Sequence, residues 1–233
     1  PVYGCTDATA DNYDAAAVVD DGSCTYTTNL IRIPDDGFKD QIVADTNNTI
    51  QNSDFQNHLG TDNWIDEALL APVTILDISK TTYQPYDIFG LTGIAGFVNL
   101  EELYIKSHST LGVLNLSNLT TLKIIDAAWC SLNTIDVSTN LDLESLNVKN
   151  CFSLGGNITD FSANTNLQYL NLRNIMLLGD LDLSSNTKLT YLEVYDNNGL
   201  KGLNLTGLDL LEELYAHNTG VGENGITGFD DCT

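Results

Sequence analysis

The chain has 233 residues, and its 32 Asp and Glu side chains against 9 Lys and Arg give a formal net charge of −23. This charge excludes nucleic acids and anionic membrane surfaces as general partners. A hydrophobic fraction of 42% with a charged fraction of 18% is typical of a folded chain rather than of a disordered acidic one.

The N-terminal segment is acidic and lies between two cysteines. Cys5 and Cys24 bracket a short polar run, which favours a disulfide and an exported, oxidising setting. Hard oxygens gathered in a small loop suit Ca²⁺, but the spacing differs from an EF-hand, and clustered acids are often only a solvated surface. A calcium site and a metal-free loop both stay open. The ligands expected for calcium are Asp7, Asn12, Asp20 and Asp21.

Residues 31–43 predict a short helix. Asp35 can accept hydrogen bonds from the free N–H groups at a helix start, and Phe38 and Ile42 lie four residues apart on one helix face. We expect that face to cover the first coil of the segment that comes after the helix.

The rest of the chain is an internal repeat. The template L-x-x-L-x-L-x-x-[N/C] recurs at intervals of 21 to 24 residues, within the range of about 20 to 29 for leucine-rich repeats. The copies start at Leu100, Leu122, Leu143, Leu167, Leu189 and Leu211, with an imperfect copy at Val73. Most copies carry a second apolar triplet, as in "LDLS" and "LNLS", whose alternation predicts another short extended segment.

These repeats predict a right-handed, β-rich solenoid. Each coil is expected to run from a strand of a concave parallel sheet to a short convex strand or 3₁₀ turn, and stacking makes the leucines one continuous core. We expect three parts: residues 1–28 as a disulfide-closed acidic module, residues 29–72 as a small helical N-terminal cap, and residues 73–233 as repeats. With no terminal cap visible after Val221, the repeats are expected to continue beyond Thr233.

The amino-acid sequence of the repeats resembles that of a known family. "LTGIAGFVNLEELYI" and "LDLSSNTKLTYLEV" resemble leucine-rich-repeat proteins of the secreted or cell-surface Bacteroidota type, and "IRIPDDGFKDQIV" resembles the helical cap before such arrays. "GCTDATADNYDAAAVVDDGSCTY" resembles a module of exported bacterial proteins and is similar to acidic calcium-binding repeats of thrombospondin type. The resemblance implies a secreted or outer-membrane-associated location.

The concave face is where such a fold binds its ligands. Its seventh repeat position is rich in bases despite the acidic composition, and aromatic residues flank that column. Such a surface could hold a protein or a polysaccharide. The alternative is that the aromatic residues favour strands and the bases neutralise Glu144 or Glu193. The candidate ligand-binding residues are Tyr104, Lys106, Trp129, Lys149, Tyr169, Arg173, Tyr191, Tyr195, Tyr215 and His217.

Cys130 and Cys151 occupy the ninth position of neighbouring coils, where buried Cys is a normal occupant. Stacked side chains point the same way rather than toward each other, so we expect two free thiols.

No catalytic motif stands out: H-E-x-x-H, G-x-S-x-G and the P-loop are missing from the sequence. No apolar run reaches the roughly 18 residues of a membrane span. We therefore expect a non-enzymatic recognition protein with no cofactor other than Ca²⁺. The alternative is a structural spacer or adhesin stalk whose contact is made by the N-terminal acidic module.

Overall fold

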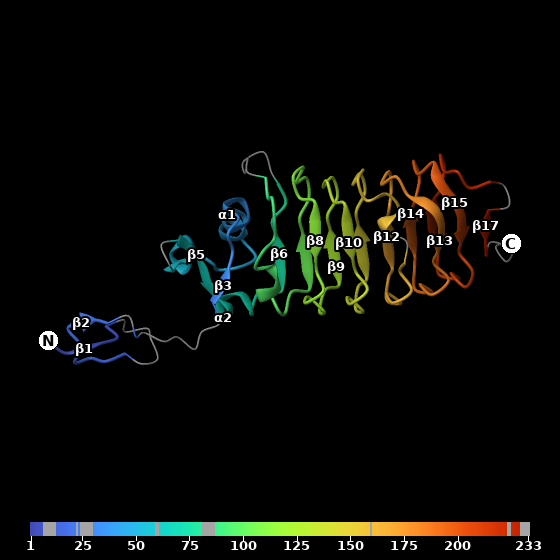
Figure 1. Cartoon of the computed structure of the whole chain (residues 1–233). Coiled ribbons are helices and arrows are strands. Elements are labelled where there is room, and N and C mark those ends of the chain that lie inside the picture. The colour runs from blue at the N-terminus through green and yellow to red at the C-terminus, as the bar shows by residue number, and fades with distance from the viewer. Residues whose placement is uncertain are drawn as a thin grey trace.

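The computed structural model describes residues 1–6, 13–21, 23, 30–58, 61–80, 87–158, 160–222 and 225–228. The coils from β6 (Ile75–Asp77) to β17 (Ile226–Thr227) follow one another along one axis, with the cap at the β6 end (Figure 1). Nearly all strand pairs in the coils are in-register and parallel, which confirms the predicted β-rich solenoid. No helix in the described part of the chain is long and apolar enough to cross a membrane.

One side of the solenoid is a parallel sheet of seven short strands, here called the long sheet, which corresponds to the predicted concave sheet. The central residue of each strand is a leucine or isoleucine that points into the core, and its two neighbours point outward. The strands are β6 (Ile75–Asp77), β7 (Glu102–Tyr104), β9 (Ile124–Asp126), β11 (Ser145–Asn147), β12 (Tyr169–Asn171), β14 (Tyr191–Glu193) and β16 (Glu213–Tyr215).

The opposite side is interrupted. Two strands pair in one part and three in another, and short 3₁₀ turns take the place of strands in the coils between and before them, as the sequence predicted. The strands are β8 (Val113–Asn115), β10 (Thr134–Asp136), β13 (Leu178–Asp182), β15 (Gly199–Asn204) and β17 (Ile226–Thr227). The 3₁₀ turns are η2 (Ile94–Gly96) and η3 (Gly155–Asn157).

The repeat leucines form one continuous core that runs from the cap to Leu208. Leu103, Leu146 and Leu192 are fully buried. Burying such a side chain stabilises the fold by about 1.5–3 kcal/mol, and each coil supplies several of them. Because each coil contacts only its neighbours, this stabilisation is distributed along the axis.

The ninth repeat position forms a buried ladder that satisfies backbone groups at the turn. Asn197 donates to the carbonyls of Leu172 and Val194, both at 2.8 Å, and its Oδ1 accepts from Ile175 and Leu177. Cys130 and Cys151 are free, as predicted, and their thiols donate to the carbonyls of Ile105 and Ala127 in the preceding coils. His108, with no exposed surface, takes the same position.

A second ladder, not predicted from the sequence, lies on the opposite side of the core. Asn140, Asn164 and Asn186 have no exposed surface, and each Nδ2 donates to two backbone carbonyls. Leu119 and Leu208 occupy the same position in the flanking coils and end the ladder with apolar rungs. The recurring S-T-N, S-A-N and S-S-N triplets were the signal that could have revealed it.

The cap contains the predicted helix and a sheet that was not predicted. Helix α1 (Asp36–Ala44) begins at Asp35, whose Oδ1 accepts from Phe38 N at 2.9 Å, and Phe38 and Ile42 are fully buried. The other Asp35 oxygen accepts from the N–H groups of Phe89 and Gly90, which ties the helix start to the repeats. The remaining elements are the antiparallel β3 (Leu30–Arg32), β5 (Thr61–Asp66) and β4 (Gln56–His58), with η1 (Asn52–Asp54) and α2 (Glu67–Leu70).

The N-terminal segment has two very short parallel strands, β1 (Tyr3–Gly4) and β2 (Val19–Asp20). It lies apart from the solenoid in Figure 1. Cys5 is buried and disulfide-bonded. Cys24 is outside the described residues, so the Cys5–Cys24 pairing stays a prediction.

Candidate functional site

The outward residues of the long sheet fall into two columns, because neighbouring strands pair in register. In β12, β14 and β16 these columns contain tyrosine, glutamate and asparagine side chains, and the next exposed column contains Arg173, Tyr195 and His217. We call the outward-pointing residues of these three coils the stripe. Its members are Tyr169, Asn171, Arg173, Tyr191, Glu193, Tyr195, Glu213, Tyr215 and His217.

The tyrosines of the stripe are stacked along the solenoid axis. The rings of Tyr169 and Tyr191 are nearly parallel, with centroids 4.5 Å apart and 11° between planes. Tyr215 lies 5.8 Å from Tyr191 with a tilt of 46°. Tyr169 and Tyr191 are register partners on neighbouring strands, so the strand register sets their stacking, whereas Tyr215 is paired with Glu193 and meets Tyr191 diagonally. The Tyr169 and Tyr191 rings cover each other's facing sides.

The Glu193 carboxylate is hydrogen-bonded to the tyrosine stack. Its side chain is 8% exposed and accepts hydrogen bonds from Asn171 Nδ2 at 2.5 Å and from Tyr191 OH at 2.8 Å. Burial, together with this carboxylate, raises the pKa of Tyr191 well above its usual value. The hydrogen bond to Glu213, made at 3.0 Å, raises the pKa of Tyr215 as well. Both phenols therefore remain neutral donors at physiological pH.

A second stack lies beside the first. The Arg173 guanidinium carbon is 4.4 Å from the centre of the Tyr195 ring, and the His217 ring stacks on Tyr195 at 4.3 Å. Arg173 Nε is also 3.8 Å from an Asp196 carboxylate oxygen. Cation–π contact and stacking hold these side chains in one arrangement without a ligand.

Tyr104 and Lys106, the other predicted site residues at the cap end, form a separate cluster. Lys106 Nζ lies 3.6 Å from Asp126 and 5.7 Å from the Tyr104 ring. Tyr104 OH donates to Glu102 at 2.8 Å, and burial, followed by that bond, raises the pKa of Tyr104 to about 12. The basic column is therefore partly neutralised by acids of the next coil.

Lys149 and Trp129 belong to neither the stripe nor the cap-end cluster. Lys149 has no ion-pair partner in the part of the chain that the structure describes. Trp129 is outside the long sheet, in the turn after β9, with 55% of its surface exposed and a φ of 65°. The structure thus divides the predicted ligand-binding residues into the stripe, the cap-end cluster and these two.

Most of the predicted calcium ligands cannot be placed. Asp7, Asn12 and the side chain of Asp20 are outside the described residues. Asp21 is described, and its Oδ1 accepts from Ser23 N at 3.0 Å. Hydrogen bonds from Ser23 lower the pKa of Asp21. The calcium site stays a prediction.

The reactive side chains of the core have structural roles. Burial raises the pKa of the Cys130 thiol to about 11 and that of Cys151 to about 12, so neither is a nucleophile at neutral pH. His108 Nε2 is 2.7 Å from the Ile78 carbonyl, and Nδ1 accepts from Ile88 N. Over the described ranges, no three His, Cys, Asp or Glu side chains are grouped to hold a metal.

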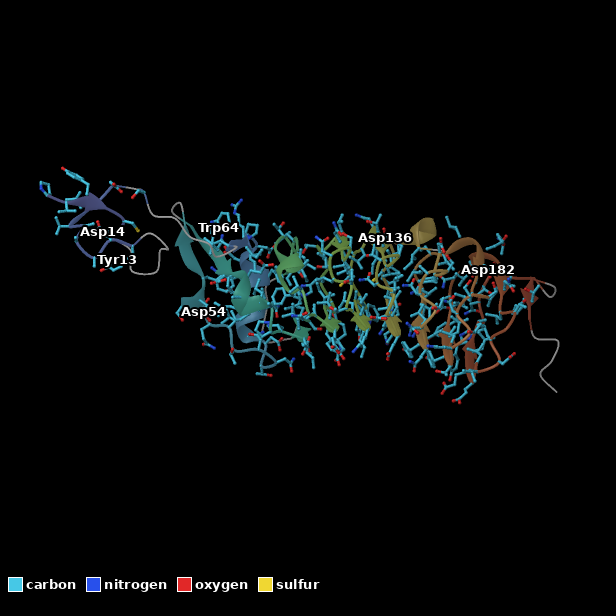
Figure 2. All side chains as sticks on the ribbon, turned by 90° about the horizontal axis from the view of Figure 1, so that it is seen from below. Tyr13, Asp14, Asp54, Trp64, Asp136 and Asp182 are labelled. Atoms are coloured by element: carbon cyan, nitrogen blue, oxygen red, sulfur yellow. The ribbon has the colours of Figure 1, made fainter. Side chains whose placement is uncertain are left out.

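A row of polar residues on the opposite side also has a structural explanation. Each accepts at Oδ1 from the backbone N–H two residues later, which ends a strand or bridge in an Asx turn. Figure 2 shows two of them, Asp136 and Asp182, along the same side of the solenoid. The row consists of Asn115, Asp136, Asp160, Asp182 and Asn204.

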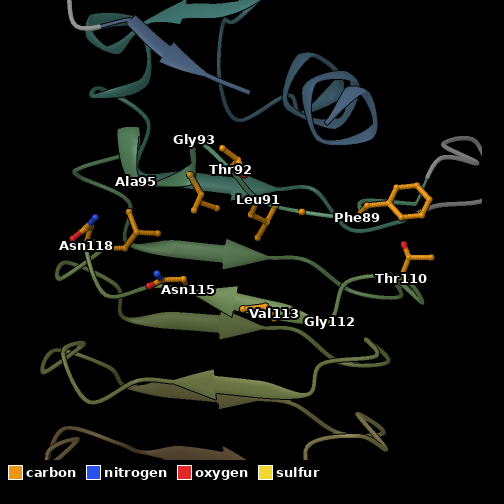
Figure 3. Close-up of a pocket in the computed structure, with 13 residues that line it drawn as sticks. Phe89, Leu91, Thr92, Gly93, Ala95, Thr110, Gly112, Val113, Asn115 and Asn118 are labelled. Carbon is orange, nitrogen blue, oxygen red and sulfur yellow. The ribbon is translucent and has the colours of Figure 1, made fainter. Parts of the chain in front are cut away.

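The opposite side also carries an open groove of about 590 Å³ between η2 and β8. Phe89 and Thr110 lie at one end of it, and Ala95 and Asn118 at the other (Figure 3). It contains no acid, base or nucleophile suited to catalysis. The stripe is therefore the better candidate for a functional site.

No protein-family model and no curated protein matches the chain. Among solved structures, it is similar to the functional domain of InlJ from Listeria monocytogenes, described as including a cysteine ladder, with 25% identity and a TM-score of 0.61. That match covers 84% of this chain but 44% of the other, so the chain spans less than half of that protein's length. Internalin C2 from the same species is 19% identical, with a TM-score of 0.53 over 86% of this chain and 90% of that one. The fold is the leucine-rich-repeat solenoid.

Proposed function

We propose that this chain is a non-enzymatic recognition protein that binds a ligand through the stripe on its long sheet. The observation that carries the proposal is that three adjacent coils present aromatic and charged side chains already fixed by stacking and hydrogen bonds. A surface ordered in advance loses little side-chain entropy on binding. Tyr and Arg are also among the residues that contribute most to protein interfaces.

A protein ligand fits the stripe better than a polysaccharide. Sugar rings bind by lying flat on exposed aromatic faces, whereas Tyr191 and Tyr195 each have ring neighbours that cover their faces. The exposed Tyr215 side chain, the Arg173 guanidinium and the Glu213 carboxylate suit the mixed polar and apolar surface of a protein. Polysaccharide binding remains the competing outcome of the test.

We infer a bacterial cell-surface or secreted location. The N-terminal acidic module, with its disulfide-bonded Cys5, is consistent with an oxidising compartment. The likeness to two Listeria monocytogenes proteins supports a bacterial origin for the fold type. Outer-membrane association and the Bacteroidota type are part of the same proposal.

The test is binding of the purified chain to arrays of neutral and sulfated polysaccharides and of individually purified extracellular proteins. A Tyr191→Ala/Arg173→Ala variant should lose about tenfold or more in affinity for its ligand. Tyr104→Ala, in the cap-end cluster of the same sheet, is the matched control and should bind like the wild type.

The competing hypothesis is a spacer whose contact is made by the N-terminal acidic, calcium-binding module. Deletion of residues 1–28 separates the two. If that deletion abolishes binding while the Tyr191→Ala/Arg173→Ala variant keeps it, the stripe is not the binding site. Repeating the measurement with a calcium chelator shows whether the module needs the ion.

A further inference from the structure

One edge of the solenoid carries an unusual group of exposed apolar side chains, here called the rim: Trp129, Phe152, Met176 and Leu178. Their exposed fractions are 55%, 50%, 60% and 59%. Trp129 follows β9, Phe152 follows β11 and Met176 follows β12, so these three lie just after the long-sheet strands, and Leu178 is the first residue of β13 on the opposite side. Their coils are stacked directly, since Trp129 N donates to Lys149 O and Asn150 N to Arg173 O, both at 2.9 Å.

Two rim residues adopt a backbone conformation that their side chains disfavour. Trp129 has a φ of 65° and Met176 a φ of 62°. The residues at the position of Trp129 in the other coils are also left-handed, but they are small and polar: Ser107, Asn150, Asn174, Asp196 and Asn218. Asn and Asp tolerate this region, whereas a bulky residue there is strained by about 1 kcal/mol. The backbone conformation at this position therefore favours asparagine over tryptophan.

Glycines in neighbouring coils leave room for one of the rim side chains. Leu178 lies over Gly156 and Gly199, and a β-carbon added at Gly199 would collide with the leucine side chain and with the Leu177 carbonyl. The glycines of neighbouring coils thus make room for a side chain that remains exposed. Single exposed apolar residues are common on proteins, but four on three stacked coils, two of them strained, form a patch.

The charge beside the rim limits what can bind there. Lys149 stands at its long-sheet border without an ion-pair partner among the described residues, whereas Arg173, one coil further, lies near Asp196. In a chain of net charge −23, an uncompensated base beside an apolar patch favours a carboxylate. Methionine and leucine offer only dispersion contacts, which suit protein side chains better than sugars.

We propose that the rim docks an extended segment of a partner protein, with apolar side chains on Trp129, Phe152 and Met176 and a carboxylate on Lys149. This inference goes beyond the proposed function, since the rim lies outside the long sheet and its apolar residues take no part in the stripe. A partner that used both surfaces would lie across the solenoid edge.

The experiment selects short random peptides, displayed on phage, against the full folded chain. We expect the retained peptides to be enriched in aromatic or aliphatic residues next to Asp or Glu. A Phe152→Ser/Met176→Ser variant should lose about tenfold or more in affinity for synthetic versions of these peptides. Lys149→Glu should shift the selection toward basic peptides.

Val113→Ser is the matched control, because Val113 is an equally exposed apolar residue on β8. It should bind like the wild type, and since Phe152, Met176 and Val113 are exposed, circular dichroism should show these variants folded. Trp129→Asn provides a second readout: it should weaken peptide binding while the chain stays folded. Failure to recover any rim-dependent peptide, peptides that depend on Tyr191 instead, or a basic consensus on the wild type would each overturn the proposal.

Discussion

At the scale of single residues, tyrosines on the long sheet each pair with a polar partner two positions away on the same strand. Tyr104 donates to Glu102 and Tyr191 to Glu193, while Asn171 donates to Tyr169. Side chains two apart on a strand share one face, so "ELY", "YLE" and "YLN" each place a phenol beside a polar partner. This pairing fixes the rings locally before any contact between coils is made.

The first prediction concerns Trp129. Replacing it with Asn should leave the free energy of unfolding about 1 kcal/mol higher than replacing it with Ala, since both lose the packing of the half-buried ring but only Asn tolerates a left-handed φ. Urea denaturation of the two variants measures the difference. Equal effects of the two substitutions would show that backbone strain at this position is negligible.

The second prediction concerns His108. Burial lowers its pKa from 6.5, despite the Asp87 carboxylate 3.9 Å from Nδ1, which Lys80 also engages. Below pH 6.5 the unfolded chain binds a proton that the folded chain does not, so the free energy of unfolding falls as pH falls. This one group can contribute a slope of at most about 1.4 kcal/mol per pH unit.

Equilibrium unfolding between neutral and mildly acidic pH measures this slope. His108→Gln keeps a donor and an acceptor but does not titrate, so its stability should change less with pH over the same interval. Identical slopes for the wild type and the variant would assign the acid sensitivity to other groups.

At the scale of elements, the coils could be predicted because their leucines recur at a nearly constant interval, and Asp35, Phe38 and Ile42 mark the cap helix. The cap sheet could not be predicted, because β3 pairs with β5 across about thirty intervening residues. No hydrophobic periodicity in the sequence indicates that pairing. The sequence pattern revealed the bases at the seventh repeat position. It did not reveal that Asp126 lies beside Lys106 or that Asp196 lies beside Arg173. The left-handed turn at Trp129 is likewise a property of coil geometry.

The third prediction belongs to the asparagine ladder. Asn164→Leu should destabilise the fold by about 1–3 kcal/mol, since the buried carbonyls of Val137 and Asn140 lose the side-chain donor and keep only a backbone donor each. Leucine has a suitable size, as Leu119 and Leu208 occupy this position elsewhere, so the loss reports mainly on hydrogen bonding. Asn166→Leu, at an exposed side chain bonded to Leu141 O, should cost well under 1 kcal/mol. A small effect at Asn164 would mean that the ladder is not a major source of stability.

At the scale of the whole molecule, the solenoid has a well-covered end and a less covered one. The cap packs Phe38 and Ile42 against the first coil, whereas Leu211 and Leu214 in the last described coil are only partly buried. A solenoid is stabilised through nearest-neighbour contacts, so this difference should appear as a gradient of local stability.

The fourth prediction follows from that gradient. In hydrogen exchange followed by mass spectrometry, peptides covering β9, β11 and β12 should exchange slowest, and those covering β16 and β17 fastest. The stripe would then extend from a rigid strand, β12, to a more mobile one, β16. Uniform protection across all coils would instead indicate a single cooperative unit.

The asparagine ladder also bears on how this array can grow. A duplicated coil inserted between the rungs at Asn140 and Asn164 meets an asparagine on each side, so the copy fits without further change. An asparagine rung also fits beside a leucine rung, since Asn140 donates to the Leu119 carbonyl of the preceding coil. Gene duplication among the middle coils therefore lengthens the rim and leaves the three coils of the stripe adjacent.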